Sequence, residues 1–91
     1  MSATTSPEIQ KAILENKWNA KAREALLGKT IIAVNYMDST DAEAMGWYSR
    51  PIIFKLSDGS VCYISSDDEG NDGGALFISD KDGKDKTLPV L

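Results

Sequence analysis

A chain of 91 residues, 42% of them hydrophobic, has room for one small packed domain, so we expect a folded chain rather than a disordered one. The absence of histidine and the single cysteine, Cys62, exclude a His-based catalytic triad, a common zinc site and a disulfide within the chain. The formal net charge of -4 disfavours binding to nucleic-acid phosphates.

The charge is unevenly distributed along the chain. Residues 8–29 contain five basic and three acidic residues and so carry +2, which leaves −6 for the remainder. The N-terminus lacks the features of a signal peptide, and no run is long and apolar enough to cross a bilayer, so we expect a cytoplasmic protein. We expect residues 1–6 to be disordered, residues 7–28 to form an N-terminal helix and residues 29–91 to form a small β-rich domain.

The predicted helix begins with a capping serine, Ser6, and a proline in its first turn, and Gly28 is a typical helix stop. At about 100° per residue, its apolar residues fall into two stripes on opposite sides. One stripe contains Ile9, Ile13, Ala20 and Leu27. The other, which we regard as a candidate partner or dimer face, contains Leu14, Trp18, Ala22 and Ala25. Either the helix breaks near Asn16 and both pieces pack on the domain, with Trp18 in the core, or one face meets a partner or a second copy.

The next elements alternate in the way expected of β-strands. In residues 30–37 we expect Ile32, Val34 and Tyr36 to face the core. A capping-box pattern at residues 40–43 then predicts a short helix that ends at Gly46.

A β-hairpin follows this helix. Residues 52–56 form a strand, and the Asp58-Gly59 pair predicts a type I′ turn, for which both residues need positive φ. In that register Leu56 would oppose Val61, and Phe54 would oppose Tyr63.

Two more strands are expected at residues 75–79 and 87–91, and Pro89 places the last one at a sheet edge. The predicted fold class is therefore α+β. We expect an N-terminal helix followed by a five-stranded, strongly bent antiparallel sheet or a small SH3-like barrel. A flat four-stranded sheet with the helix across one face is the alternative architecture.

Three segments are distinctive when taken together: Gly46–Pro51, Ser66–Phe77 and Leu88–Leu91. They resemble a family of small, uncharacterised bacterial and phage proteins. The resemblance covers about residues 27–91 and leaves the N-terminal helix outside. Because no activity is known for such proteins, the resemblance implies no catalytic or binding residue in this chain.

An acidic, glycine-rich loop precedes the fourth predicted strand, and its carboxylates are Asp67, Asp68, Glu69 and Asp72. Such a loop could hold Ca²⁺ or Mg²⁺, but the spacing does not fit an EF-hand, and we assign no metal ligand. We interpret the loop as a sharp turn in which Gly70, Gly73 and Gly74 supply positive φ and the acidic side chains cap backbone N–H groups.

The segment before the second strand combines two aromatics with an arginine. We hypothesise that the guanidinium of Arg50 pairs with a carboxylate at position 67, 68 or 72, beside one of the aromatic rings. We expect Trp47 to close one end of the sheet or barrel and Tyr48 to be exposed.

These patterns favour a non-catalytic protein-interaction or regulatory module of unknown partner, and a basic protein surface is the preferred target. No catalytic residue and no cofactor are assigned. The alternatives are a Ca²⁺- or Mg²⁺-binding module that uses residues 67–72, an acidic nucleic-acid mimic and a small enzyme. The candidate binding surface comprises Trp47, Tyr48, Arg50, Asp67, Asp68, Glu69 and Asp72.

Overall fold

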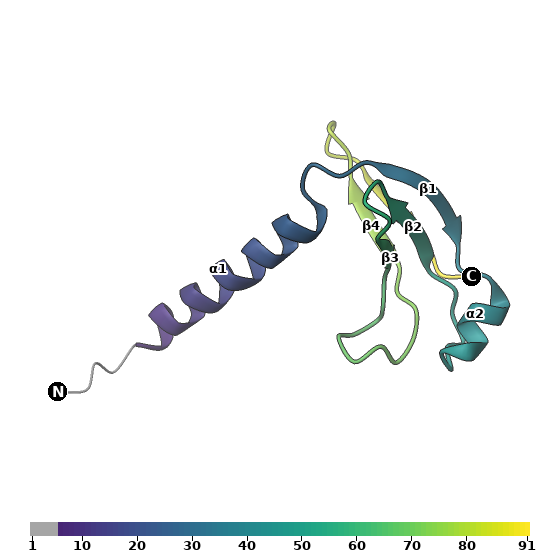
Figure 1. Cartoon of the computed structure of the whole chain (residues 1–91), viewed down its shortest axis with the longest axis horizontal. Coiled ribbons are helices and arrows are strands. Elements are labelled where there is room, and N and C mark those ends of the chain that lie inside the picture. The colour runs from purple at the N-terminus through teal and green to yellow at the C-terminus, as the bar shows by residue number, and fades with distance from the viewer. Residues whose placement is uncertain (1–5) are drawn as a thin grey trace.

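A long helix projects from a β-rich body in the computed structural model of the chain (Figure 1), which describes residues 6–91. Most of the segment expected to be disordered, residues 1–5, lies outside the described residues. The elements are α1 (Pro7–Leu26), β1 (Ile31–Tyr36), α2 (Ser39–Ala44), β2 (Ile52–Leu56), β3 (Val61–Tyr63), β4 (Leu76–Ser79) and β5 (Asp85–Leu88).

Helix α1 begins at Pro7, as the sequence predicts, and ends at Leu26, whereas the predicted range extends to residue 28. The Ser6 hydroxyl accepts a hydrogen bond from the Ile9 N–H at 3.3 Å, and Gly28 ends the helix with φ +77°. The helix runs unbroken through Asn16, and none of its residues is buried. As a result, the chain has a radius of gyration of 17.1 Å, against about 12 Å for a compact chain of this length.

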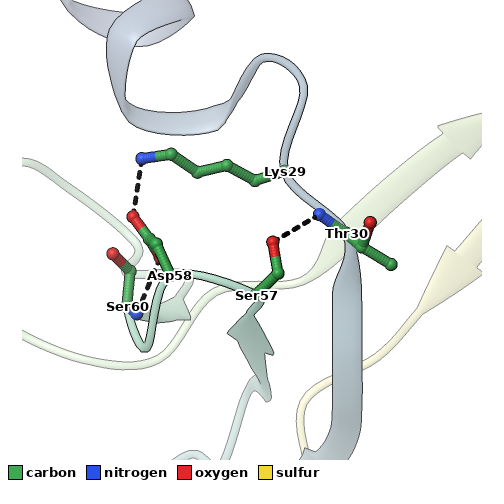
Figure 2. Close-up of polar contacts among 5 residues, drawn as sticks. All are labelled: Lys29, Thr30, Ser57, Asp58 and Ser60. Atoms are coloured by element: carbon green, nitrogen blue, oxygen red, sulfur yellow. Dashed lines mark hydrogen bonds and ion pairs between the residues drawn. The ribbon is translucent and has the colours of Figure 1, made fainter.

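The junction between α1 and β1 is tied to the turn between β2 and β3 (Figure 2). The Lys29 ammonium lies 2.7 Å from Asp58 Oδ2. The Thr30 N–H donates to Ser57 Oγ at 3.1 Å, and the Ser57 N–H donates to the Thr30 carbonyl at 2.8 Å. The helix therefore leaves the body from a fixed point.

The strands form two antiparallel sheets, one with the order β1-β2-β3 and one that contains β4 and β5. The predicted α+β class is confirmed, but no barrel is closed and the five strands do not share one sheet, so neither the SH3-like barrel nor the single bent sheet is confirmed. The acidic loop separates the two sheets. Its base is closed by a bridge between Ser65 and Gly73 and by a hydrogen bond from the Gly74 N–H to the Ile64 carbonyl at 2.8 Å.

The register of the β2–β3 hairpin differs from the prediction by one residue. Gly59 has φ +92°, whereas no non-glycine among residues 6–91 has positive φ, so the turn is not type I′. The Leu56 N–H donates to the Ser60 carbonyl at 2.8 Å, which makes the loop one residue longer than predicted. Tyr63 therefore pairs with Ile53 instead of Phe54, and their side chains share one face of the sheet.

The largest buried cluster lies at the end of the sheet that α2 covers. Met37, Ala42 and Trp47 are buried together, and Ile53 packs against them. Helix α2 is capped by the Asp38 carboxylate, which accepts from the Asp41 N–H at 2.8 Å. The predicted capping residue, at position 40, is two residues late, and the predicted stop at a glycine is correct.

The prediction that alternate residues of strand β1 face a core is wrong for Ile32 and Val34. Ile32 and Val34 are 57% and 54% exposed, and of the strand's residues Tyr36 alone is partly covered. The reason is structural: β1 is an edge strand, and α1, the longer of the two helices in residues 6–91, projects away from it (Figure 1).

The C-terminal strand is also displaced. Strand β5 is Asp85–Leu88 rather than residues 87–91, and it pairs with β4. The residues beyond it reach the connector before β2, where Leu91 and Arg50 exchange two backbone hydrogen bonds of 3.0 Å.

Candidate functional site

The acidic loop and the connector before β2 meet at Asp72. Its Oδ1 accepts backbone N–H groups from Ser49 at 2.9 Å, from Gly73 at 2.8 Å and from Tyr48 at 3.2 Å. These bonds, that of Ser49 foremost, hold the pKa of Asp72 below its usual value because they favour the charged carboxylate. A single side chain thus fixes the backbone of residues 48–49 against the loop.

Trp47 makes the second connection between these two segments. Its indole N–H donates to the Gly70 carbonyl at 2.7 Å, and its ring meets the ring of Tyr63 edge-on at 5.8 Å. Trp47 is 5% exposed, which agrees with its predicted place at one end of the sheet. The ring is thus buried while its polar atom is satisfied by the loop.

Two glycines of the loop serve a purpose other than the predicted one. Gly70 has φ +76°, as expected, but Gly73 and Gly74 do not have positive φ. They are required because the chain passes too close for a side chain. A Cβ on Gly73 would lie 2.7 Å from the Ser49 carbonyl oxygen and from Pro51 Cδ, and one on Gly74 would lie 2.8 Å from the Ser65 carbonyl oxygen.

The tip of the loop is organised by Asp67. Its Oδ1 accepts the Glu69 N–H at 3.0 Å and the Asn71 N–H at 3.2 Å, and its Oδ2 accepts from the Asn71 side-chain amide at 2.8 Å. The Asn71 amide is the main cause of the lowered pKa of Asp67. Within residues 6–91, no group of three or more acidic or thiol side chains is arranged to hold a metal ion.

Arg50 does not play the predicted role. Its Nη1 donates to the Met37 carbonyl at 3.4 Å, and the ion pair found within 4.0 Å among residues 6–91 joins Lys29 and Asp58 instead. The hypothesis was right that the two segments meet and wrong about the side chain responsible. Two signals in the sequence pointed to the true contacts: an aspartate that ends a loop often accepts backbone N–H groups, and a buried tryptophan needs a partner for its N–H.

A cleft of about 510 Å³ opens beside this junction, between α2 and the connector. It is lined by Ser39, Ala42, Glu43, Gly46, Trp47, Tyr48 and Arg50. Tyr48 is 95% exposed, as the sequence predicted. Sequence reasoning missed Glu43, because nothing in its helical pattern indicates that α2 packs beside the connector.

The candidate partner face on α1 lies apart from this site. Its residues are exposed, and Trp18 is therefore not in the core of the chain. The ammonium groups of Lys17 and Lys21 lie 5.8 Å and 4.9 Å from the centre of the Trp18 ring.

We compared the chain with protein-family models, with curated proteins and with solved structures, and no match was found. The resemblance of residues 27–91 to small bacterial and phage proteins therefore stays a prediction. Among the helices in the described residues, none has both the length and the apolar character needed to cross a membrane.

Proposed function

We propose that this chain is a non-catalytic protein-interaction module, whose binding surface is the cleft beside α2 together with the adjoining acidic loop. The observation that carries this proposal is the state of Tyr48, which is 95% exposed on a backbone fixed from both sides. An exposed tyrosine on a fixed backbone has only two side-chain torsions to order, so it supplies a large amphipathic contact area at little cost in conformational entropy.

The charge around Tyr48 favours a basic partner. Glu43 lines the cleft, and Asp68 and Glu69 are exposed in the loop that Trp47 binds. The chain outside residues 8–29 carries −6, so a Lys- and Arg-rich segment would be attracted to this surface from a distance. The proposal keeps the predicted cytoplasmic location.

The carboxylates of the loop support binding rather than acid–base catalysis. A general acid at neutral pH needs a raised pKa, whereas the pKa values of Asp67 and Asp72 are lowered by the hydrogen bonds that hold the loop. The same bonds occupy oxygens that a cation would need. No specific observation favours the cation-binding, nucleic-acid-mimic or enzyme alternatives over protein binding.

The proposal is tested by fluorescence anisotropy with short labelled peptides rich in Lys and Arg, against peptides in which Glu replaces both. We expect the basic peptides alone to bind, and we expect Tyr48→Ser to weaken binding about tenfold, which corresponds to about 1.4 kcal/mol. The paired change Asp68→Asn with Glu69→Gln should lower the affinity, and it should also make the affinity depend less on the salt concentration.

Phe77→Ser provides the matched control, because Phe77 is an exposed aromatic on β4, outside the cleft. Equal binding by the wild type, by Tyr48→Ser and by the paired loop change would contradict the proposal. Thermal melts with EDTA and with added Ca²⁺ separate the cation alternative, since a cation that binds only the folded chain raises Tm.

A further inference from the structure

Helix α1 shows apolar side chains that nothing in the described chain covers. Ile13 is 60% exposed, and the other members of its stripe, Ile9, Ala20 and Leu27, are exposed as well. Helices in proteins owe most of their stability to the packing of such a face, and water does not provide it.

Strand β1 is uncovered in the same way. Ile31, Ile32 and Val34 are all more than half exposed, and one edge of the strand has no neighbour in the sheet. A long, exposed, apolar edge strand is normally covered by another element, because it otherwise invites aggregation.

We infer that the chain forms a two-fold dimer in which α1 of each copy lies on β1 of the other. The part of the stripe that lies within α1, Ile9, Ile13 and Ala20, packs against Ile31, Ile32 and Val34 of the second copy. This inference goes beyond the proposed function and does not depend on it, since it involves neither the cleft nor the acidic loop.

The junction between α1 and β1 favours packing of α1 on a second copy over packing of α1 on its own chain. Four residues, 27–30, connect the two elements, and Lys29 and Thr30 are both tied to the β2–β3 turn (Figure 2). That leaves Leu27 and Gly28 to reverse the direction of the chain. A short hinge that is fixed at one end favours exchange of the element between two copies.

Charge complementarity points to the same partner. Residues 8–29 carry +2 and the rest of the chain carries −6. Helix α1 itself carries +1, from four basic and three acidic residues, so it is attracted at long range to the negatively charged body of a second copy, and this attraction acts twice in a two-fold dimer.

The exposed area is sufficient for such an interface. The chain exposes 7189 Å², whereas a compact monomer of its mass is expected to expose about 5,200 Å². Residues 1–5 lie outside the described residues, and because five residues of any conformation expose at most about 800 Å², that area is subtracted from the excess of about 2,000 Å². The remainder of about 1,200 Å² exceeds the roughly 800 Å² that each partner buries in a standard interface.

The opposite stripe of α1 is less suited to this contact. The ammonium groups of Lys17 and Lys21 lie over the Trp18 ring, and they would lose water if that stripe were buried. The aliphatic stripe matches the aliphatic side chains of β1 and needs no charge to be buried.

The first test is sedimentation velocity on the full chain over a range of concentrations, with two matched variants, Ile13→Glu and Trp18→Glu. We expect a dimer for the wild type and for Trp18→Glu, and we expect the Kd of Ile13→Glu to rise about a hundredfold, because it buries an unpaired charge. A monomeric wild type overturns the inference. So does loss of the dimer in Trp18→Glu while circular dichroism shows that the helix is retained, because the helices would then pair through the Trp18 stripe.

The second test needs no destabilising change and stays decisive if Ile13→Glu does not fold. The photoreactive residue benzoylphenylalanine replaces Ile13, and this chain is mixed with an isotopically labelled copy that lacks it. Irradiation should join position 13 to residues 31–34 of the labelled copy, as read by mass spectrometry. A crosslink within one chain, or one to α1 of the labelled copy, contradicts the inference.

Discussion

The two ends of the β-rich body differ in how many of their side chains are hydrogen-bonded or covered within the chain. At the end that carries the cleft, Asp72 and Trp47 tie the acidic loop to the connector, and the polar groups involved have partners within the chain. At the other end, β1 and α1 expose apolar side chains that lack a cover among residues 6–91. The first end therefore presents Tyr48 on a fixed backbone, whereas the second end leaves apolar side chains exposed to water.

The largest loss of stability is expected when the acidic loop can no longer approach the connector closely at the end that carries the cleft. Gly73→Ala places a methyl group 2.7 Å from the Ser49 carbonyl oxygen and the Pro51 ring, so the connector and the loop must separate. We expect a loss of about 3 kcal/mol in the free energy of unfolding, measured by urea denaturation.

Gly83→Ala is the control for this change. Gly83 has φ +78° but no heavy atom near its would-be Cβ, so that variant should lose only about 1 kcal/mol from backbone strain. Equal losses for the two glycines would show that the contact at Gly73 is not tight in solution.

A smaller effect is expected from Trp47→Phe, which keeps a buried ring and removes the N–H that reaches the Gly70 carbonyl. We expect a loss of about 1 kcal/mol and faster amide exchange in the acidic loop. Amide exchange followed by NMR distinguishes the two ends, since β1 should be unaffected. Unchanged exchange in the loop would mean that the loop holds its shape without Trp47.

Asp72 should make the stability of the end that carries the cleft depend on pH. Because its pKa is lower in the folded chain than the ordinary value of about 3.9, its contribution is fully present above that value and is lost as pH falls through the folded pKa. Asp72→Asn should therefore flatten the decline of Tm below about pH 4. An unaltered acid profile would assign the decline to the other carboxylates whose pKa values are lowered in the folded chain, Asp58 and Asp67.

The smallest effect should come from Lys29→Ala at the junction of the two ends. The Lys29 ammonium holds the pKa of Asp58 well below its usual range, but the pair lies at the surface and is screened by salt. We expect the Tm of the body to change little. NMR titration should show the pKa of Asp58 returning towards its ordinary value, and an unchanged pKa would contradict the ion pair.

Much of the fold follows from local signals in the sequence. The capping serine, Pro7 and Gly28 define α1, and the alternating pattern at residues 52–56 gives β2. The register of the β2–β3 hairpin was missed, because an Asp-Gly pair fits both a two-residue turn and the longer loop found here. That choice decides whether Tyr63 pairs with Ile53 or Phe54, and no local pattern determines it.

The candidate site was predictable in its parts and not in its contacts. The sequence marked the connector and the acidic loop, and it placed Tyr48 outside and Trp47 inside. It favoured Arg50 as the link because opposite charges attract, but the carboxylate of Asp72 is used by backbone N–H groups that are close by. The exposure of β1 was not predictable, since alternation shows which residues could be buried and not whether anything covers them.

The hydrogen bonds and ion pairs of its aspartates determine where this chain is most prone to form isoaspartate. Three aspartates precede glycine, namely Asp58, Asp72 and Asp82, and such steps cyclise to succinimide when the carboxyl group is available to the next backbone nitrogen. Asp58 is engaged by Lys29 and Ser60, and Asp72 is held as a carboxylate by the backbone N–H groups of Tyr48 and Ser49 across the junction. No hydrogen bond or ion pair engages the Asp82 carboxylate within residues 6–91. On prolonged storage, isoaspartate should accumulate first in the β4–β5 turn, leaving both the binding surface and the helix junction intact.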